Sequence, residues 1–176
     1  KREAEVVRKL DTDHAPRVHG FGELEDGSPY ILMEKLVGES LKDVLDAHGK
    51  VHWRQAIEWI IQACEGLQVA HDAGVLHRDL KPDNLFVMEN AIKILDFGVA
   101  TFVSGHTDQY GALTHTSSLV GTPHYMSAEQ VRATVLGPTS DIYMLGVVLY
   151  QLISGARPFR GDNLGVTGVV KLSPPP

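Results

Sequence analysis

The sequence predicts an α+β fold in which short strands alternate with amphipathic helices, and three observations support this prediction. Apolar residues recur every three or four positions over Trp53–His71, which is the spacing of one helix face. Short apolar runs at Ile31–Met33, Leu85–Met88 and Ile92–Leu95 have the length of strands. Residues Asp141–Ser154 are apolar on nearly every side, which is typical of a helix that is buried all round.

The first third of the chain is predicted to contain two short helices and a hairpin. Apolar residues in 1–10 fall at helical spacing among charges. Residues 18–24 are predicted to form a strand, and Asp26-Gly27 is a hairpin turn that leads to the run at Ile31–Met33. After Gly38 breaks the pattern, a second helix is predicted from the spacing of Leu41, Val44 and Leu45.

The longest predicted helix runs from Trp53 to His71, with Gly74 just past its end. Its predicted apolar stripe consists of Ile57, Ile60, Ile61, Cys64, Leu67 and Ala70. Cys64 is therefore expected to be a small buried hydrophobe. As the single cysteine of the chain, it excludes an internal disulfide and suits a reducing compartment.

Two further strands, Leu85–Met88 and Ile92–Leu95, are joined by a tight turn at Glu89-Asn90. Residues 96–124 are rich in Gly, Ser, Thr and His and show little periodicity. A stretch of this length without regular structure inside a compact domain is usually functional.

Composition narrows the classes of partner. The formal net charge of −6 argues against nucleic acid or an anionic membrane as the main partner, because both attract basic surfaces. No stretch approaches the roughly 20 apolar residues that span a bilayer. The first residues read as the middle of a helix and the last as a loop broken off, so the chain is expected to be a fragment.

Three segments carry the chemistry: the octapeptide His77–Asn84, the tripeptide Asp96-Phe97-Gly98, and the stretch from Gly121-Thr122-Pro123 to Ser127-Ala128-Glu129. Together and in this order they resemble the signature set of the serine/threonine protein kinases. The resemblance covers essentially the whole chain and implies a protein-kinase-like fold. Residues 1–36 would be a remnant of the N-lobe with the start of the hinge, and residues 37–176 would be most of the mainly helical C-lobe without its last helices.

Phosphoryl transfer explains why these residue types are needed, because it demands that a hydroxyl be positioned and that phosphate charge be neutralised. By the resemblance, Asp79 would accept or orient the proton of the substrate hydroxyl. Lys81 would place a cation near the transferred group. Asn84 and Asp96 offer hard oxygen ligands for the Mg²⁺ that bridges ATP phosphates. The hairpin at 85–95 would return Asp96 to the neighbourhood of Asn84.

The nucleotide site is implied by the resemblance alone. Met33 would guard the back of the pocket, the backbone at Glu34 and Leu36 would bond adenine, and Phe86 would pack beneath the base. Glu3 resembles the regulatory-helix glutamate that pairs with the ATP-binding lysine. Plain core packing is the alternative explanation for Met33, Leu36 and Phe86, and it is compatible with these roles.

Other matching positions form a column between the lobes. Val7, His77 and Phe97 resemble members of a stacked apolar column, and Asp141 would anchor its base.

Specificity and regulation also follow from the resemblance. Lys81-Pro82 is the serine/threonine form of the catalytic loop, and Thr122 resembles the threonine that bonds the catalytic Asp and Lys. Arg78 immediately precedes Asp79, as in kinases whose loop is ordered by a phosphorylated residue. Thr114 and Thr116 lie where bacterial members are autophosphorylated, so phosphate there is expected to activate the enzyme.

The sequence departs from the family pattern at two places. The Gly-rich phosphate loop and the strand with the ATP lysine are absent, so the parent protein is expected to be active and this fragment inactive. Ser127-Ala128-Glu129 replaces the usual Ala-Pro-Glu or Ser-Pro-Glu. Glu129 is expected to be a buried carboxylate without its arginine partner, at a cost of about several kcal/mol.

The expected partners are ATP and proteins with Ser or Thr acceptors, with no nucleic acid. The expected location is the cytoplasm, with a parent protein that is tethered to a membrane elsewhere, as in the bacterial branch of the family. Two alternatives stay open: a pseudokinase-like scaffold without turnover, and a metal-binding protein that uses some of the nine histidines, such as His48 and His52.

Overall fold

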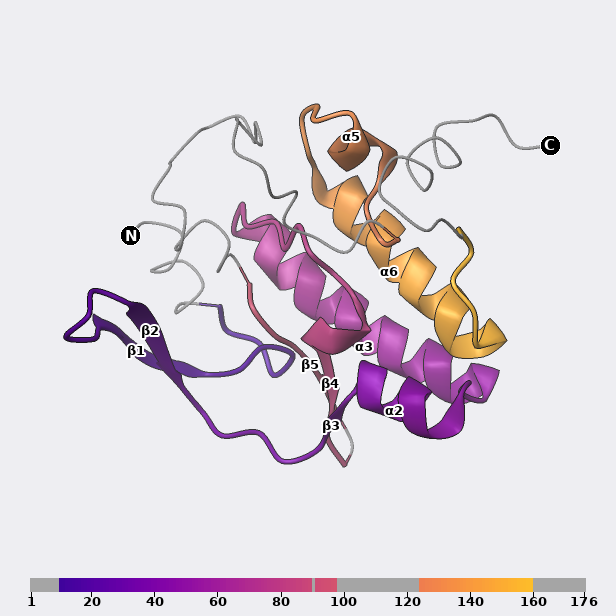
Figure 1. Cartoon of the computed structure of the whole chain (residues 1–176), viewed down its shortest axis with the longest axis horizontal. Helices are drawn as coiled ribbons and strands as arrows, with labels where there is room; N and C mark the ends of the chain where they lie inside the picture. The colour runs from indigo at the N-terminus through magenta and orange to yellow at the C-terminus, as the bar shows by residue number, and fades with distance from the viewer. Residues whose placement is uncertain (1–9, 90, 98–123, 160–176) are drawn as a thin grey trace.

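The computed structural model describes residues 10–89, 91–97 and 124–159 (Figure 1). Its elements are β1 (Val18–Glu23), β2 (Pro29–Met33), β3 (Glu39–Ser40), α2 (Leu41–His48), α3 (Trp53–Asp72), the 3₁₀ helix η1 (Pro82–Asn84), β4 (Leu85–Val87), β5 (Ile92–Ile94), α5 (Ala128–Val131) and α6 (Pro138–Ser154). The described part of the chain therefore mixes helices and strands, as predicted. The helix predicted within residues 1–10 and most of the stretch 96–124 lie outside the described residues.

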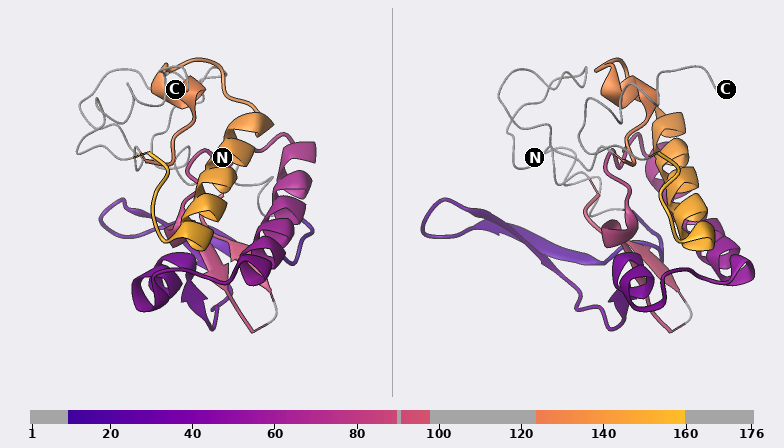
Figure 2. Two further views of the ribbon diagram at one scale, coloured as in Figure 1. Left: turned by 90° about the vertical axis from the view of Figure 1, so that its right-hand side faces the viewer. Right: turned by 45° about the vertical axis from the view of Figure 1, so that its right-hand side comes forward.

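Strands β1 and β2 form the predicted antiparallel hairpin, in which Phe21 pairs with Ile31. Its turn is stabilised by Asp26, whose carboxylate accepts a hydrogen bond from Ser28 N at 2.8 Å. Gly27 adopts a φ of +85°, which glycine tolerates without strain. The hairpin extends away from the helices in Figure 1 and in the right-hand view of Figure 2.

A second sheet has the antiparallel order β3-β4-β5. Leu85 pairs with Ile94, and Met88 N donates to Ala91 O at 2.8 Å, which confirms the predicted hairpin. Strand β3 was not predicted. Gly38 allows its approach, because a Cβ there would lie 1.9 Å from the carbonyl oxygen of Val87.

Helix α2 begins with a capping box. Ser40 Oγ accepts from Asp43 N, and the Asp43 carboxylate accepts from Ser40 N, each at 3.1 Å. Leu41, Val44 and Leu45 are all buried, as the helical spacing predicted.

Helix α3 lies at the centre of the fold and packs against both β5 and α6. It ends where predicted, with Gly74 at a φ of +76°. The predicted face was partly wrong, because Ile57, Ile61 and Cys64 are exposed. The buried residues are Ala56, Ile60, Ala63, Gly66, Leu67 and Ala70, so small side chains let the neighbouring elements approach the helix closely.

Helix α6 runs beside α3 and starts with Pro138 in its first turn. Its buried apolar residues are Met144, Leu145, Val147, Val148 and Leu152. The prediction that it is buried all round was wrong, because Ile142, Tyr150 and Ile153 are 48%, 52% and 39% exposed.

Within the described ranges, no helix combines the length and apolar character needed to cross a bilayer.

Candidate active site

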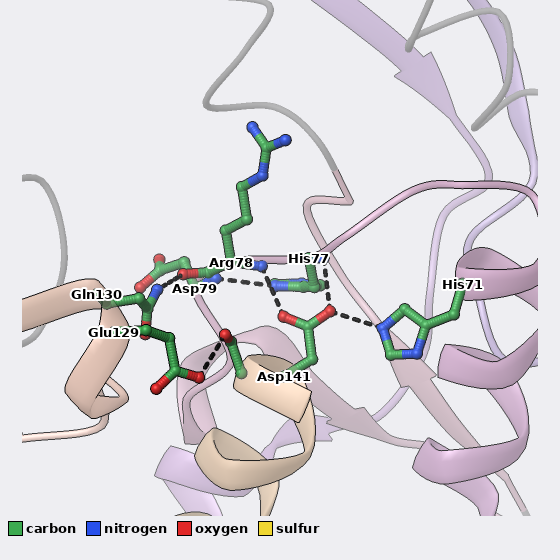
Figure 3. A network of polar contacts seen from close by, with 8 residues as sticks. His71, His77, Arg78, Asp79, Glu129, Gln130 and Asp141 are labelled. Atoms are coloured by element: carbon green, nitrogen blue, oxygen red, sulfur yellow. Dashed lines mark hydrogen bonds and ion pairs between the residues drawn. The ribbon is translucent and has the colours of Figure 1, made fainter. Parts of the chain in front are cut away.

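The loop that follows α3 is held by one buried carboxylate. Asp141, at the start of α6, is only 1% exposed. One of its oxygens, Oδ1, accepts from Arg78 N at 2.9 Å, and Oδ2 accepts from His77 N at 2.9 Å (Figure 3). The ring nitrogen Nε2 of His71 lies 2.7 Å from Oδ2. These contacts satisfy a carboxylate that would be costly to bury without partners, and they fix the start of the loop.

Arg78 takes an unusual backbone conformation. Its φ is +71°, which is uncommon for a residue with a side chain. Its N–H is held by Asp141, and its carbonyl oxygen accepts from Nε2 of Gln130 at 2.6 Å. Strained residues of this kind persist where the surroundings determine the backbone, and they cluster at functional sites.

Asp79 follows this turn and sits in a polar cluster. Lys81 Nζ lies 2.8 Å from Asp79 Oδ2. The buried amide of Asn84 donates from Nδ2 to the carbonyl oxygen of Asp79 at 2.8 Å and to its Oδ2 at 3.4 Å. With its nitrogen turned toward Asp79, the amide of Asn84 presents its oxygen elsewhere as an acceptor. The structure thus brings three of the predicted site residues together.

The β4–β5 hairpin returns the chain to this cluster. Leu95 N donates to Asn84 O at 2.8 Å, so the residue before Asp96 is tied to Asn84. Asp96 itself is exposed and has a φ of +60°. The backbone just before Asp96 therefore lies against the backbone of Asn84, where the predicted hairpin was expected to return it.

His77 links the loop to the residues around Asp96. Its Nε2 lies 2.7 Å from Leu95 O, and its Nδ1 accepts from Asp79 N at 3.3 Å. Burial lowers the pKa of His77, which favours the neutral ring with its proton on Nε2. The ring meets Phe97 edge-on at a centroid distance of 5.1 Å. This contact is part of the predicted column, whereas Val7 lies outside the described residues.

A second polar cluster surrounds the predicted hinge. Glu34 N donates to Arg17 O, and Arg17 N donates back to Glu34 Oε1, each at 2.9 Å. Lys93 Nζ lies 2.6 Å from the same oxygen and 3.2 Å from Ala15 O. The Lys93 ammonium lowers the pKa of the Glu34 carboxyl. Met33 ends β2 just before Glu34 and is 38% exposed.

Comparison with known protein families identifies the family of this chain. The family model described as "Protein kinase domain" matches residues 1–171. The chain belongs to the protein kinase family.

Curated proteins similar to this chain include bacterial kinases. The chain is 39% identical over 168 residues to serine/threonine-protein kinase pkn3 of Myxococcus xanthus, which covers 93% of this chain and 30% of that protein. It is 38% identical over 167 residues to serine/threonine-protein kinase PknB of Mycolicibacterium smegmatis, which covers 93% of this chain and 26% of that protein. The chain thus spans less than a third of the length of these relatives.

Several residues that the kinase resemblance singled out lie outside the described residues: Glu3, Gly98, Thr114, Thr116 and Thr122. Of the others, Leu36 is partly buried, and the Phe86 ring lies against Gly38, just after the hinge segment. The roles of Met33, Glu34, Leu36 and Phe86 toward a nucleotide stay predictions.

The expectation for Glu129 needs correction. This carboxylate is only partly buried and accepts from the hydroxyl of Ser140 at 2.6 Å, so it has a partner within the chain (Figure 3). The same hydrogen bond lowers its pKa.

The side chains of His71, Lys93 and Gln130 take part in these polar clusters and were not predicted. For Gln130 a signal was present, because Ser127 and Gln130 have the spacing of a capping box, and both of its hydrogen bonds form. His71 and Lys93 belong to no motif, and their partners lie 70 and 59 residues away in the sequence.

The oxygen atoms of Asn84 and Asp96 suit a Mg²⁺ ion that is shared with a substrate, rather than a metal ion that is held by protein ligands alone. Among the described residues, no group of three or more His, Cys, Asp or Glu side chains could hold a metal ion. Mg²⁺ at kinase sites is held by one or two protein ligands together with substrate phosphates. The amide oxygen of Asn84 and the carboxylate of Asp96 match that pattern.

Proposed function

We propose that the protein carrying this chain transfers the γ-phosphoryl group of ATP to serine and threonine hydroxyls of proteins. The observation that supports this most is the Asp79 carboxylate, with Lys81 Nζ at 2.8 Å and the Asn84 amide at 3.4 Å, beside the returning Asp96 segment. Membership of the kinase family supports the same reaction. Serine/threonine specificity is supported by Lys81-Pro82 and, as an expectation, by Thr122.

In the proposed step, the oxygen of the substrate hydroxyl attacks the γ-phosphorus. A new O–P bond forms, the bond from the γ-phosphorus to the bridging oxygen breaks, and ADP leaves. Asp79 orients the hydroxyl and takes its proton. Lys81 balances negative charge on the transferred group while it also holds the Asp79 carboxylate in place.

Bound Mg²⁺ would neutralise phosphate charge, and Asn84 and Asp96 would hold it. The hydrogen bond from Leu95 N to Asn84 O supports this assignment, because it holds the backbone just before Asp96 against that of Asn84. In the same proposal, Met33, Glu34, Leu36 and Phe86 surround adenine, and Glu3 pairs with the ATP lysine. Residues 1–36 then belong to the N-lobe and hinge, and residues 37–176 belong to the C-lobe.

The alternative is a scaffold that keeps the fold without turnover. A scaffold has no need for a carboxylate that is held by a cation and placed beside two oxygen ligands, so the cluster favours the enzyme.

Use of ATP and the single cysteine favour a cytoplasmic location.

A transfer assay tests the proposal. The intact protein is incubated with labelled ATP, Mg²⁺ and a Ser/Thr-containing protein substrate. Asp79→Asn removes the proton acceptor, so kcat is expected to fall by about 100- to 10,000-fold. The matched control is Asp72→Asn at the end of α3, an exposed carboxylate that is bonded by Gln68. Equal activity of the Asp79→Asn variant and the wild type would overturn the proposal.

Regulation by phosphate on Thr114 or Thr116 is part of the same proposal. A phosphate there would pair with the guanidinium of Arg78, next to Asp79, and order the loop. Replacing both threonines with alanine is expected to abolish activation by preincubation with ATP. If the double variant is as active as the wild type after that preincubation, this regulation is excluded.

A further inference from the structure

The side chain of Gln130 joins the helix α5 to the strained peptide before Asp79. It is 8% exposed, and both ends of its amide are used. Its Oε1 accepts from Ser127 N at 2.8 Å, at the start of α5. Its Nε2 donates to the carbonyl oxygen of Arg78 at 2.6 Å. Figure 3 shows it facing the loop from the side opposite to Asp141.

These contacts restrain Arg78 from both directions. Asp141 holds the N–H of Arg78 at 2.9 Å, and Gln130 holds its carbonyl oxygen. The peptide between Arg78 and Asp79 carries that oxygen, so its orientation sets the direction in which the Asp79 side chain leaves the backbone. With a φ of +71°, Arg78 would move toward more favourable angles if either restraint were lost.

We propose that Gln130 is a positioning residue for the reaction, which aims the Asp79 carboxylate through the carbonyl of Arg78. The inference rests on the proposed function, because Asp79 is its target. It requires an amide: one atom must donate to Arg78 O while another accepts from Ser127 N. Asn is too short to span both partners. An ionised carboxylate can accept from Ser127 N but cannot donate to Arg78 O.

Two variants of the intact protein separate positioning from packing. Gln130→Met keeps the volume of the side chain but loses both hydrogen bonds. Gln130→Glu keeps the bond from Ser127 N, but when ionised it turns a carboxylate oxygen toward Arg78 O. Each is expected to lower kcat by about 10- to 100-fold while the KM for ATP stays nearly constant, because the hydroxyl acceptor is misplaced and the nucleotide site is not.

The pH profile supplies a readout that a purely structural role would not change. Once protonated, the carboxyl group of the Gln130→Glu variant can donate to Arg78 O, so its kcat relative to wild type should recover as pH falls from 8 toward 6. Burial beside a carbonyl oxygen favours the protonated form. The charged or titratable side chains drawn with it in Figure 3 are Glu129 on its own helix, His77, Arg78 and Asp79 on the loop, Asp141 on α6 and His71 on α3. The Gln130→Met variant should show no such recovery.

The matched control is Gln151→Glu on α6. Gln151 accepts from the hydroxyl of Tyr125 at 2.6 Å, and a carboxylate can accept in the same way. This variant should keep the kcat and pH profile of the wild type. The proposal is overturned if both Gln130 variants keep the kcat of the wild type. It is also overturned if their losses are equal and independent of pH.

Amide hydrogen exchange tests the same restraint without any turnover. In Gln130→Met the amides of Arg78 and Asp79 should exchange faster, while those of Ala63 and Leu67 in α3 stay protected as in the wild type. Unchanged exchange at Arg78 and Asp79 would overturn the inference. Absence of phosphoryl transfer by the wild type would instead refute the proposed function, and the exchange result would still decide whether Gln130 restrains the loop.

Discussion

At the scale of single residues, two lysine–carboxylate pairs differ in burial, and burial determines how much an ion pair contributes to stability. The side chains of Lys93 and Glu34 are 13% and 34% exposed, and Lys93 also bonds the carbonyl of Ala15. Those of Lys42 and Asp46, one turn apart on α2, are 51% and 65% exposed. Exposed pairs of the second kind contribute little, because water screens them.

We therefore predict that Lys93→Met lowers the melting temperature of the intact protein at neutral pH, whereas Lys42→Met leaves it unchanged. Lys93 lowers the pKa of Glu34 below its ordinary value of 4.5. The stability that comes from this pair is therefore present above pH 4.5 and is lost as pH falls through the lowered pKa. Calorimetry should show the difference between Lys93→Met and wild type shrinking below pH 4.5. A difference that persists there would assign the effect to packing.

The motif residues were predictable as single positions because their chemistry demands particular side chains. Asp79, Lys81 and Asn84 converge as expected. The residues that hydrogen-bond to other predicted positions were harder to predict. Ser140 as the partner of Glu129, and Lys93 as the partner of Glu34, depend on contacts between distant segments, which no local spacing encodes.

At the scale of elements, α3 shows where periodicity succeeds and where it fails. The pattern predicted its length within one residue but assigned Ile57, Ile61 and Cys64 to the buried face. Ala56, Ala63 and Gly66 are buried instead. Large apolar side chains dominate a periodicity count, whereas close packing selects small ones. The same limit affected α6. Because apolar residues occur on nearly every side of this helix, the sequence could not indicate which side is buried.

Gly66 gives a direct test of this packing. A Cβ added there would lie 2.6 Å from the Cβ of His14 and 3.2 Å from Cδ1 of Ile94. Alanine normally stabilises a helix relative to glycine by about 0.5–1 kcal/mol, but here we predict a loss of about 1–3 kcal/mol from overpacking. Thermal unfolding of Gly66→Ala should show a lower melting temperature.

The control is Gly146→Ala in α6, where a new Cβ would have no described atom within 4 Å apart from its chain neighbours and the nearby backbone of its own helix. That variant should be as stable as the wild type or more stable. A rise in melting temperature for Gly66→Ala would mean that α3 does not pack against the segment around His14 as closely as described.

At the scale of the whole molecule, one helix organises the site. α3 packs against β5 on one side and α6 on another (Figure 1). His71, near the end of α3, and Asp141, at the start of α6, meet next to the loop that carries Asp79. β5 leads into Leu95, which bonds both Asn84 and His77. The core thus places the loop and the hairpin end beside each other before any substrate arrives.

The most direct test of this account is a crystal structure of the intact kinase domain with Mg²⁺ and a non-hydrolysable ATP analogue. We expect a metal ion about 2.0–2.1 Å from the amide oxygen of Asn84 and from a carboxylate oxygen of Asp96. We also expect Asp79 to face the γ-phosphate across the site. A nucleotide bound with its metal away from residues 84 and 96, or with Asp79 turned from the phosphates, would contradict it.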